Sequence, residues 1–231
     1  GQTGGSIRIK TTGDVDVQVL GTANGRIDVS GEGGGGLAVV RAGGAFVLAG
    51  VADAQSDTSA SDGGEIDVTA GGTPTVSGTF NVSGGSQGAG GYISFEAGGA
   101  VTVTNTLDAS GGLGDGGEID IDSQRADVSV GPMTVDGTGT GSGGTVMVTA
   151  AGNITLNGVI TGAGAGTGGN GGDGGEIDAI ASGTTRILAL LSLPSGDGGF
   201  GGTLDLEAGS AADLIISAAL KANGAGSAGC G

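Results

Sequence analysis

The sequence predicts an all-β fold: a right-handed parallel β-helix (β-solenoid) of about eight coils of 26–31 residues, with three short strands in each coil. Three observations lead to this prediction. A Gly-Gly pair followed by an alternating apolar segment recurs, the repeats are almost evenly spaced, and the 59 glycines gather between the apolar segments. We expect residues 1–231 to form a single solenoid domain, with coils that start near residues 6, 36, 65, 92, 118, 145, 176 and 203.

The first strand of each coil follows the glycine pair and has the clearest pattern. Counted from that pair, successive repeats lie 30, 29, 27, 26, 27, 31 and 27 residues apart. Two positions of each strand, separated by one residue, are apolar in every repeat, and such alternation indicates a strand with one buried face. The expected inward pairs are Ile7/Ile9, Leu37/Val39, Ile66/Val68, Ile93/Phe95, Ile119/Ile121, Val146/Val148, Ile177/Ala179 and Leu204/Leu206.

Two further strands in each coil are shorter. The second strand is expected at Val15/Val17, Phe46/Leu48, Val101/Val103, Val128/Val130, Ile154/Leu156 and Leu214/Ile216. The third strand, just before the glycine-rich corner, is expected at Ile27/Val29, Phe80/Val82, Leu107/Ala109 and Leu220/Ala222. A single coil cannot bury its own apolar face, so we expect the coils to stack in register, with each strand pairing to its equivalents in the neighbouring coils.

Other folds fit the sequence less well. An antiparallel sandwich or barrel also uses short alternating strands, but it does not require the same phase every 26–31 residues. Residues 186–193 and 211–221 are rich in Leu and Ala and could form helices, yet both fall where the repeat predicts strands. Disorder is disfavoured because only 13% of residues are charged and the β-branched residues are placed periodically.

The composition excludes several functions. The chain has no histidine, so it cannot form a Ser-His-Asp or Cys-His catalytic set. With one tyrosine and no tryptophan it lacks the aromatic platforms of a sugar-cleaving cleft, and its glycine-rich segments lack the Lys-Ser/Thr of a phosphate-binding loop. We therefore expect no enzymatic activity.

The net charge of −17 limits the partners of the protein. Nucleic acids and anionic membranes require clustered Lys and Arg, whereas this chain has 24 acidic residues and only 7 basic ones. No segment approaches the roughly 20 apolar residues of a membrane-spanning helix, so we expect no direct membrane insertion. A second copy of the chain, a cation or a basic molecule remains a suitable partner.

One acidic motif, Asp-Gly-Gly-Glu-Ile-Asp, recurs in the third, fifth and seventh coils. Its acidic residues are Asp62, Glu65, Asp67, Asp115, Glu118, Asp120, Asp173, Glu176 and Asp178. Their placement favours a solvated face, on which repulsion is limited because the acids are about 10 Å apart, two coils at about 4.8 Å each. The alternative is a set of calcium sites, since calcium prefers several oxygen ligands near tight turns. Calcium would then be the single cofactor.

The two end coils predict self-association. The first coil presents the edges at Ile7, Ile9, Val15 and Val17, and the eighth presents those at Leu204, Leu206, Leu214 and Ile216. Unpaired strand edges invite pairing, and a head-to-tail contact that does not close on itself propagates as a fibre. The chain begins with Gly1 instead of Met, so we expect a processed product or a segment of a longer protein. Cys230 has no second cysteine to pair with; it is either a free thiol or an intermolecular link or surface anchor.

The run Gly143–Gly175, GGTVMVTAAGNITLNGVITGAGAGTGGNGGDGG, resembles the glycine-rich β-helix repeats of large bacterial surface and secreted proteins. Filamentous-haemagglutinin-like adhesins and autotransporter passenger domains are similar in style, and the resemblance extends over the whole chain at the level of the repeat pattern. It implies an extracellular or bacterial cell-surface location with an adhesive, structural or matrix role. We expect an extracellular structural protein that self-associates; an adhesin or passenger stalk and a calcium-binding solenoid are the alternatives.

Overall fold

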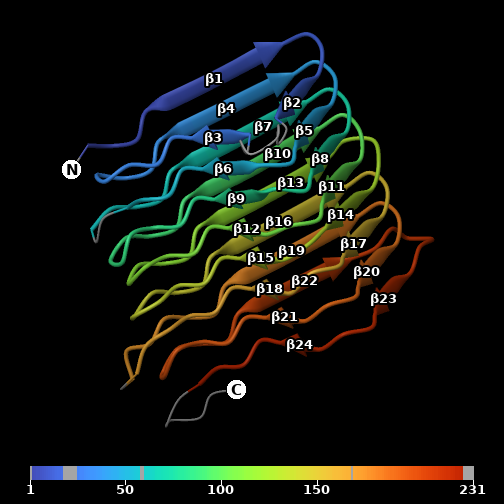
Figure 1. The fold of residues 1–231 in the computed structure, drawn as a ribbon. Coiled ribbons are helices and arrows are strands. Elements are labelled where there is room, and N and C mark those ends of the chain that lie inside the picture. Colours follow the sequence, from blue (N-terminus) through green and yellow to red (C-terminus); the bar gives the residue numbers. More distant parts are fainter. Residues whose placement is uncertain (1, 18–24, 58–59, 168, 226–231) are drawn as a thin grey trace.

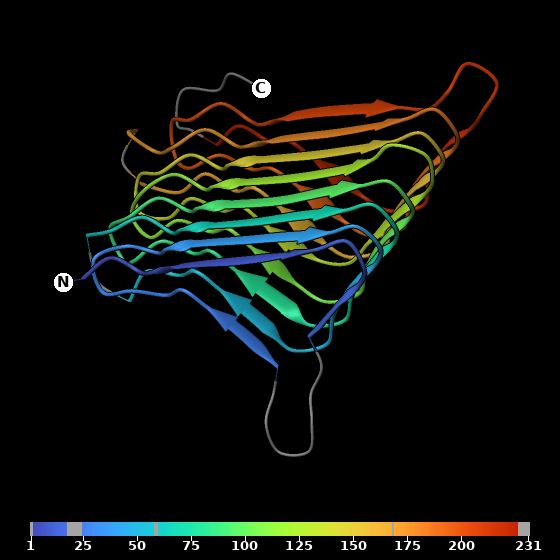
Figure 2. The same ribbon diagram turned by 90° about the horizontal axis from the view of Figure 1, so that it is seen from above.

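The computed structural model describes residues 2–17, 25–57, 60–167 and 169–225. In these ranges the chain is all-β, without a helix, and winds through three parallel eight-stranded sheets (Figure 1). Each coil contributes one strand to each sheet, which gives the molecule three sides (Figure 2). The predicted β-solenoid of eight coils with three strands per coil is confirmed.

The strands are grouped here by sheet. Sheet 1 consists of β1 (Ser6–Thr11), β4 (Leu37–Ala42), β7 (Glu65–Ala70), β10 (Tyr92–Ala97), β13 (Glu118–Ser123), β16 (Thr145–Ala150), β19 (Glu176–Ala181) and β22 (Thr203–Glu207). Sheet 2 consists of β2 (Val15–Val17), β5 (Phe46–Leu48), β8 (Pro74–Val76), β11 (Val101–Val103), β14 (Val128–Val130), β17 (Ile154–Leu156), β20 (Thr185–Ile187) and β23 (Leu214–Ile216). Sheet 3 consists of β3 (Arg26–Asp28), β6 (Val51–Asp53), β9 (Thr79–Asn81), β12 (Leu107–Asp108), β15 (Met133–Thr134), β18 (Ile160–Thr161), β21 (Leu191–Ser192) and β24 (Leu220–Lys221).

The predicted inward pair of the second coil is wrong. Ala38 pairs with Ile7 and Ile66 in the neighbouring coils, and both Ala38 and Val40 are fully buried. Leu37 and Val39 therefore belong to the outer face, and the second coil starts at residue 37 instead of 36. This coil follows four glycines, residues 33–36, and the prediction took Gly35 instead of Gly36 as the second glycine of the pair. A shift of one residue reverses the inward and outward faces of a strand.

The remaining predicted inward pairs agree with the register of the sheets. Residues 186–193 and 211–221 overlap strands β20, β21, β23 and β24. The strands that the repeat predicts there are therefore confirmed, and these residues do not form helices. Several inward pairs were not predicted because they break the aliphatic alternation with alanine, proline, threonine or methionine. They are Ala52/Ala54, Pro74/Val76, Met133/Val135 and Thr185/Ile187. The aliphatic pair Leu191/Leu193 also points inward and was missed.

The inward side chains of all three sheets form one continuous core along the solenoid axis. Aliphatic residues dominate it, and three phenylalanines, Phe46, Phe80 and Phe95, are its largest buried side chains. Two of these rings, Phe80 and Phe95, pack with their centroids 5.0 Å apart and tilted by 54°. A few aromatic residues suffice because the core is narrow and each coil covers the next.

The glycine pairs permit the coils to approach one another. A Cβ atom on the second glycine of a pair would lie 1.9–2.2 Å from the carbonyl oxygen of the equivalent glycine in the preceding coil, at Gly36, Gly64, Gly91, Gly117, Gly144, Gly175 and Gly202. The same oxygen accepts a hydrogen bond from the first strand residue of the following coil, as when Tyr92 N donates to Gly64 O at 2.9 Å. Any side chain at these positions would force the coils apart and break that hydrogen bond.

We therefore expect Gly91→Ala to destabilise the fold by roughly 1–3 kcal/mol or more, as overpacking does. Gly5→Ala is the matched control, because Gly5 occupies the same place in the first coil and a Cβ there would have no atom within 4 Å. Thermal and urea unfolding of the two variants measure the difference. Equal melting temperatures would show that close stacking does not explain the glycine pairs.

Candidate functional site

The outer face of sheet 1, the sheet with the longest strands, carries most of the acidic motif. Its side chains form three columns that run along the solenoid axis. The first outer column is Ser6, Leu37, Glu65, Tyr92, Glu118, Thr145, Glu176 and Thr203. The second is Arg8, Val39, Asp67, Ser94, Asp120, Met147, Asp178 and Asp205. The third is Lys10, Arg41, Thr69, Glu96, Asp122, Thr149, Ile180 and Glu207.

Charge is separated along this face. Within the three columns, coils 1 and 2 contribute three basic residues and no acidic one: Arg8, Lys10 and Arg41. Coils 3 to 8 contribute ten acidic residues and no basic one: Glu65, Asp67, Glu96, Glu118, Asp120, Asp122, Glu176, Asp178, Asp205 and Glu207. The face is thus basic in the first two coils and acidic from the third coil to the last, except for the uncharged coil 6.

Crowding of carboxylates affects two aspartates on this face. Burial raises the pKa of Asp120 above the usual range, and the neighbouring Glu118 and Asp122 add to the effect. Burial and the adjacent Asp205 likewise raise the pKa of Asp178, whose Oδ1 is buried without a hydrogen-bond partner. The Tyr92 hydroxyl donates to Asp120 and partly offsets the rise of its pKa, whereas the buried oxygen of Asp178 would be better satisfied by a donor or a cation.

The raised pKa of Asp120 gives a pH prediction. The folded protein holds this proton to higher pH than the unfolded chain, so stability falls as the pH rises from about 4, the usual aspartate pKa, through the raised value. We expect Asp120→Asn to raise the melting temperature by a few degrees at neutral pH, with the gain disappearing below about pH 4. Asp213→Asn, at an exposed position, is the control and should show no such pH-dependent gain.

The first aspartate of each acidic motif has a structural task. The Oδ1 atoms of Asp62, Asp115 and Asp173 accept hydrogen bonds of 2.8 Å from backbone N–H groups 27 residues further on, in the next coil. The donors are Ala89, Ser142 and Phe200. These carboxylates join the glycine-rich corner of one coil to that of the next.

The same device occurs at other corners and was not predicted. Backbone N–H groups of the next coil donate to Asp14 Oδ1 at 2.7 Å, to Asp127 and Asp136 Oδ1 at 2.6 Å, and to Asn153 Oδ1 at 2.8 Å. In the sequence, these acceptors are visible only as an Asp or Asn within a corner. Corner residues show no apolar alternation, so the direction of their side chains could not be predicted. Six of the 24 acidic residues therefore join neighbouring coils in this way.

The nine acidic residues proposed as calcium ligands are not brought together. Asp62, Asp115 and Asp173 point along the corners, while the Glu and second Asp of each motif lie on the outer face of sheet 1, separated by the intervening coils. Within the described ranges, no group of three or more acidic or cysteine side chains is close enough to hold a metal ion.

We expect Asp115→Ala to lose about 1 kcal/mol of stability, because the Ser142 N–H then lacks its acceptor. Asp115→Asn keeps the accepting oxygen and should retain most of that stability. The measurement is urea unfolding with and without excess chelator. Equal losses for both variants, together with destabilisation of the wild type by chelator, would instead favour calcium binding at this residue.

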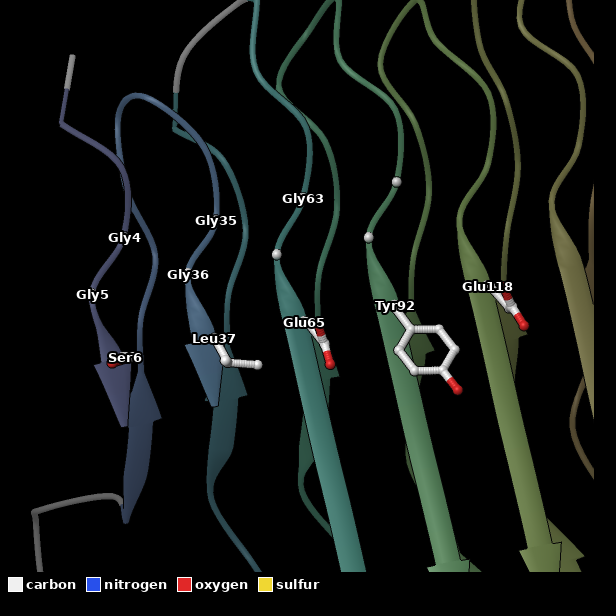
Figure 3. A pocket seen from close by; sticks show the side chains of 13 residues that line it. Gly4, Gly5, Ser6, Gly35, Gly36, Leu37, Gly63, Glu65, Tyr92 and Glu118 are labelled. Carbon is white, nitrogen blue, oxygen red and sulfur yellow. The ribbon is translucent and has the colours of Figure 1, made fainter. Parts of the chain in front are cut away.

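A shallow groove of about 770 Å³ runs beside the first outer column across coils 1 to 5 (Figure 3). Its floor is made of glycine pairs, and Leu37, Glu65, Tyr92 and Glu118 project along it in successive coils. Burial raises the pKa of Tyr92, so this phenol is not an acid near neutral pH. The groove is lined by carboxylates, a phenol, a serine and glycine backbone, and this set offers no activated nucleophile.

The two end coils differ from the inner ones in burial. The inward residues Leu214, Ile216 and Leu220 of coil 8 are 43%, 45% and 38% exposed. Their equivalents one coil earlier, Thr185, Ile187 and Leu191, are fully buried.

The other predicted self-association residues are more covered. Ile7, Ile9 and Val17 of coil 1, and Leu204 and Leu206 of coil 8, are half-buried, while Val15 is buried and adds little to the end surface. The apolar surface open to a partner is therefore larger on coil 8 than on coil 1. Cys230 lies outside the described residues.

Comparison of the chain with protein-family models, with curated proteins and with solved structures found no match. In the part of the chain that the structure describes, there is no helix of the length and apolarity needed to cross a membrane.

Proposed function

We propose that this protein is an extracellular structural protein whose solenoids associate head to tail into a filament or surface matrix. Coil 8 of one copy would stack on coil 1 of the next as coil 7 stacks on coil 8 within the chain. The observation that carries the proposal is the exposure of the inward side chains of coil 8, which are fully buried at the equivalent places in inner coils.

Matching strands support this contact. The first strand is six residues long in coil 1 and five in coil 8, and the second is three residues long in both. Stacking would add one strand pairing to each of the three sheets. Each backbone hydrogen bond formed there would stabilise the contact by roughly 0.5–1.5 kcal/mol net. It would also bury the apolar end of the core. The contact joins different ends of the molecule, so it propagates instead of closing.

The extracellular location is supported by the resemblance of the repeat to those of bacterial surface and secreted proteins. The alternative function is an adhesin stalk. In that case the same solenoid would be a spacer, and the binding site would lie elsewhere. The two functions differ in solution: a stalk stays monomeric, whereas a structural solenoid assembles as its concentration rises.

Gly5→Ala tests the stacking directly. Alone, the chain accommodates this Cβ, because no atom lies within 4 Å of it. In a stack, the register of the inner coils would place Gly202 O of the neighbouring copy against the new methyl group, at the 1.9–2.2 Å separation seen for the other seven pairs. We expect the wild type to form filaments and Gly5→Ala to remain a folded monomer, with the melting temperature that the wild type has at concentrations too low for assembly.

Sedimentation velocity over a range of concentrations and negative-stain microscopy provide the measurement. Ser6→Ala is the control, since its side chain lies on the outer face and the change adds no atoms. A wild-type chain that stays monomeric at high concentration would overturn the proposal in favour of the stalk. Filaments of Gly5→Ala equal to those of the wild type would rule out this register.

A further inference from the structure

We propose that charged pairs on the outer face of sheet 1 fix the polarity and register of the head-to-tail contact. Arg8 of coil 1 would bind Asp205 in coil 8 of the neighbouring copy. Lys10 would bind Glu207 in the same way. This inference rests on the proposed function and names the residues that select the partner, a second copy of this chain.

The register of sheet 1 places these residues opposite one another. Every strand of the sheet pairs with the next in the same register along the glycine pairs, so the outer columns run straight through all eight coils. Continuing that register by one coil brings Thr203 opposite Ser6, Asp205 opposite Arg8 and Glu207 opposite Lys10. In each of the two charged pairs, one side chain is basic and the other is acidic.

The molecule already contains an arginine that joins neighbouring coils in this way. Arg26 in β3 lies 2.9 Å from the carboxylate of Asp28 in its own strand and 2.8 Å from that of Asp53 in the next coil. The guanidinium thus spans the distance between coils and pairs with carboxylates on both. In the proposed contact, Arg8 would likewise pair with a carboxylate of the adjoining coil.

The outer face of coil 8 favours a cation. Asp205 lies beside Asp178, which has an unpartnered buried oxygen, and Glu207 also belongs to the acidic part of the face. Burial and, after it, the charge of Asp205 raise the pKa of Asp178. A basic side chain stacked on Asp205 would relieve this repulsion, and coils 1 and 2 hold the three basic residues of the face.

The same charges exclude wrong contacts. Two first coils facing each other would place basic residues together, and two eighth coils would place carboxylates together, so head-to-head and tail-to-tail contacts are disfavoured. A register shift of two residues would keep the inward and outward faces but lose one of the two pairs. The apolar core cannot by itself make these distinctions, because hydrophobic contact is non-directional.

Charge reversal tests the inference. The double variant Arg8→Glu/Lys10→Glu has acidic residues on both ends, and Asp205→Arg/Glu207→Lys has basic residues on both ends. We expect each alone to require at least a roughly tenfold higher concentration for assembly than the wild type. Mixed in equal amounts, the two variants should form filaments of alternating copies, and the chain carrying all four changes should assemble alone.

A matched control separates this effect from net charge. The double variant Arg125→Glu/Arg186→Glu also lowers the net charge by four, from −17 to −21. Its two substitutions lie in coils 5 and 7 and leave the charged residues of coils 1 and 8 unchanged. It should assemble like the wild type. Sedimentation velocity of single and mixed proteins, with circular dichroism to verify folding, gives the readout.

The outcomes distinguish the two proposals. If the wild type does not assemble, head-to-tail stacking itself is wrong. If the wild type and both double variants assemble at equal concentration, stacking stands and the charged pairs do not guide it. Two folded variants that fail to assemble even when mixed, or a quadruple variant that stays monomeric, would also overturn the pairing.

Discussion

The close approach of successive backbones at the glycine pairs is the constraint on which the rest of the structure depends. Each second glycine lies against the carbonyl group of its equivalent in the coil before, and that carbonyl accepts the hydrogen bond that starts the next strand of sheet 1. The register of sheet 1, which has the longest strands, is set there. That register decides which side chains of each strand point inward and which point outward. The abundance of glycine is therefore a packing requirement and not a sign of flexibility.

Acidic residues contribute to cohesion as well as to charge. Aspartate side chains in the corners accept backbone N–H groups of the following coil, at places where the chain turns and the regular ladder of hydrogen bonds is interrupted. A backbone N–H left without an acceptor would be unfavourable, so a carboxylate at such a corner stabilises the stack. Ten other acids lie on the outer face of sheet 1, where burial and mutual repulsion raise the pKa of Asp120 and Asp178.

The sequence was sufficient for the fold because the repeat and the strand alternation reinforce one another across eight coils. It failed at Leu37, where four consecutive glycines hid which pair begins the strand, and at strands such as Pro74–Val76, whose residues break the aliphatic pattern. The aspartate contacts between corners could not be predicted, because neither partner belongs to a periodic segment. The repeat alone sets Arg8 and Lys10 of the first coil against Asp205 and Glu207 of the eighth, and the register of sheet 1 adds Arg41 to the basic end of the face.

Strand pairing joins each coil only to the coils directly before and after it. The mechanical response of such a molecule to tension at its ends differs from that of a globular domain, since in the described residues strand pairing joins only adjacent coils. Pulling on a terminal strand would peel the solenoid one coil at a time, releasing 26–31 residues per step, or roughly 90–110 Å of extended chain. The inner coils would keep their structure throughout, so the material would lengthen under load while the remaining solenoid stayed ready to rewind.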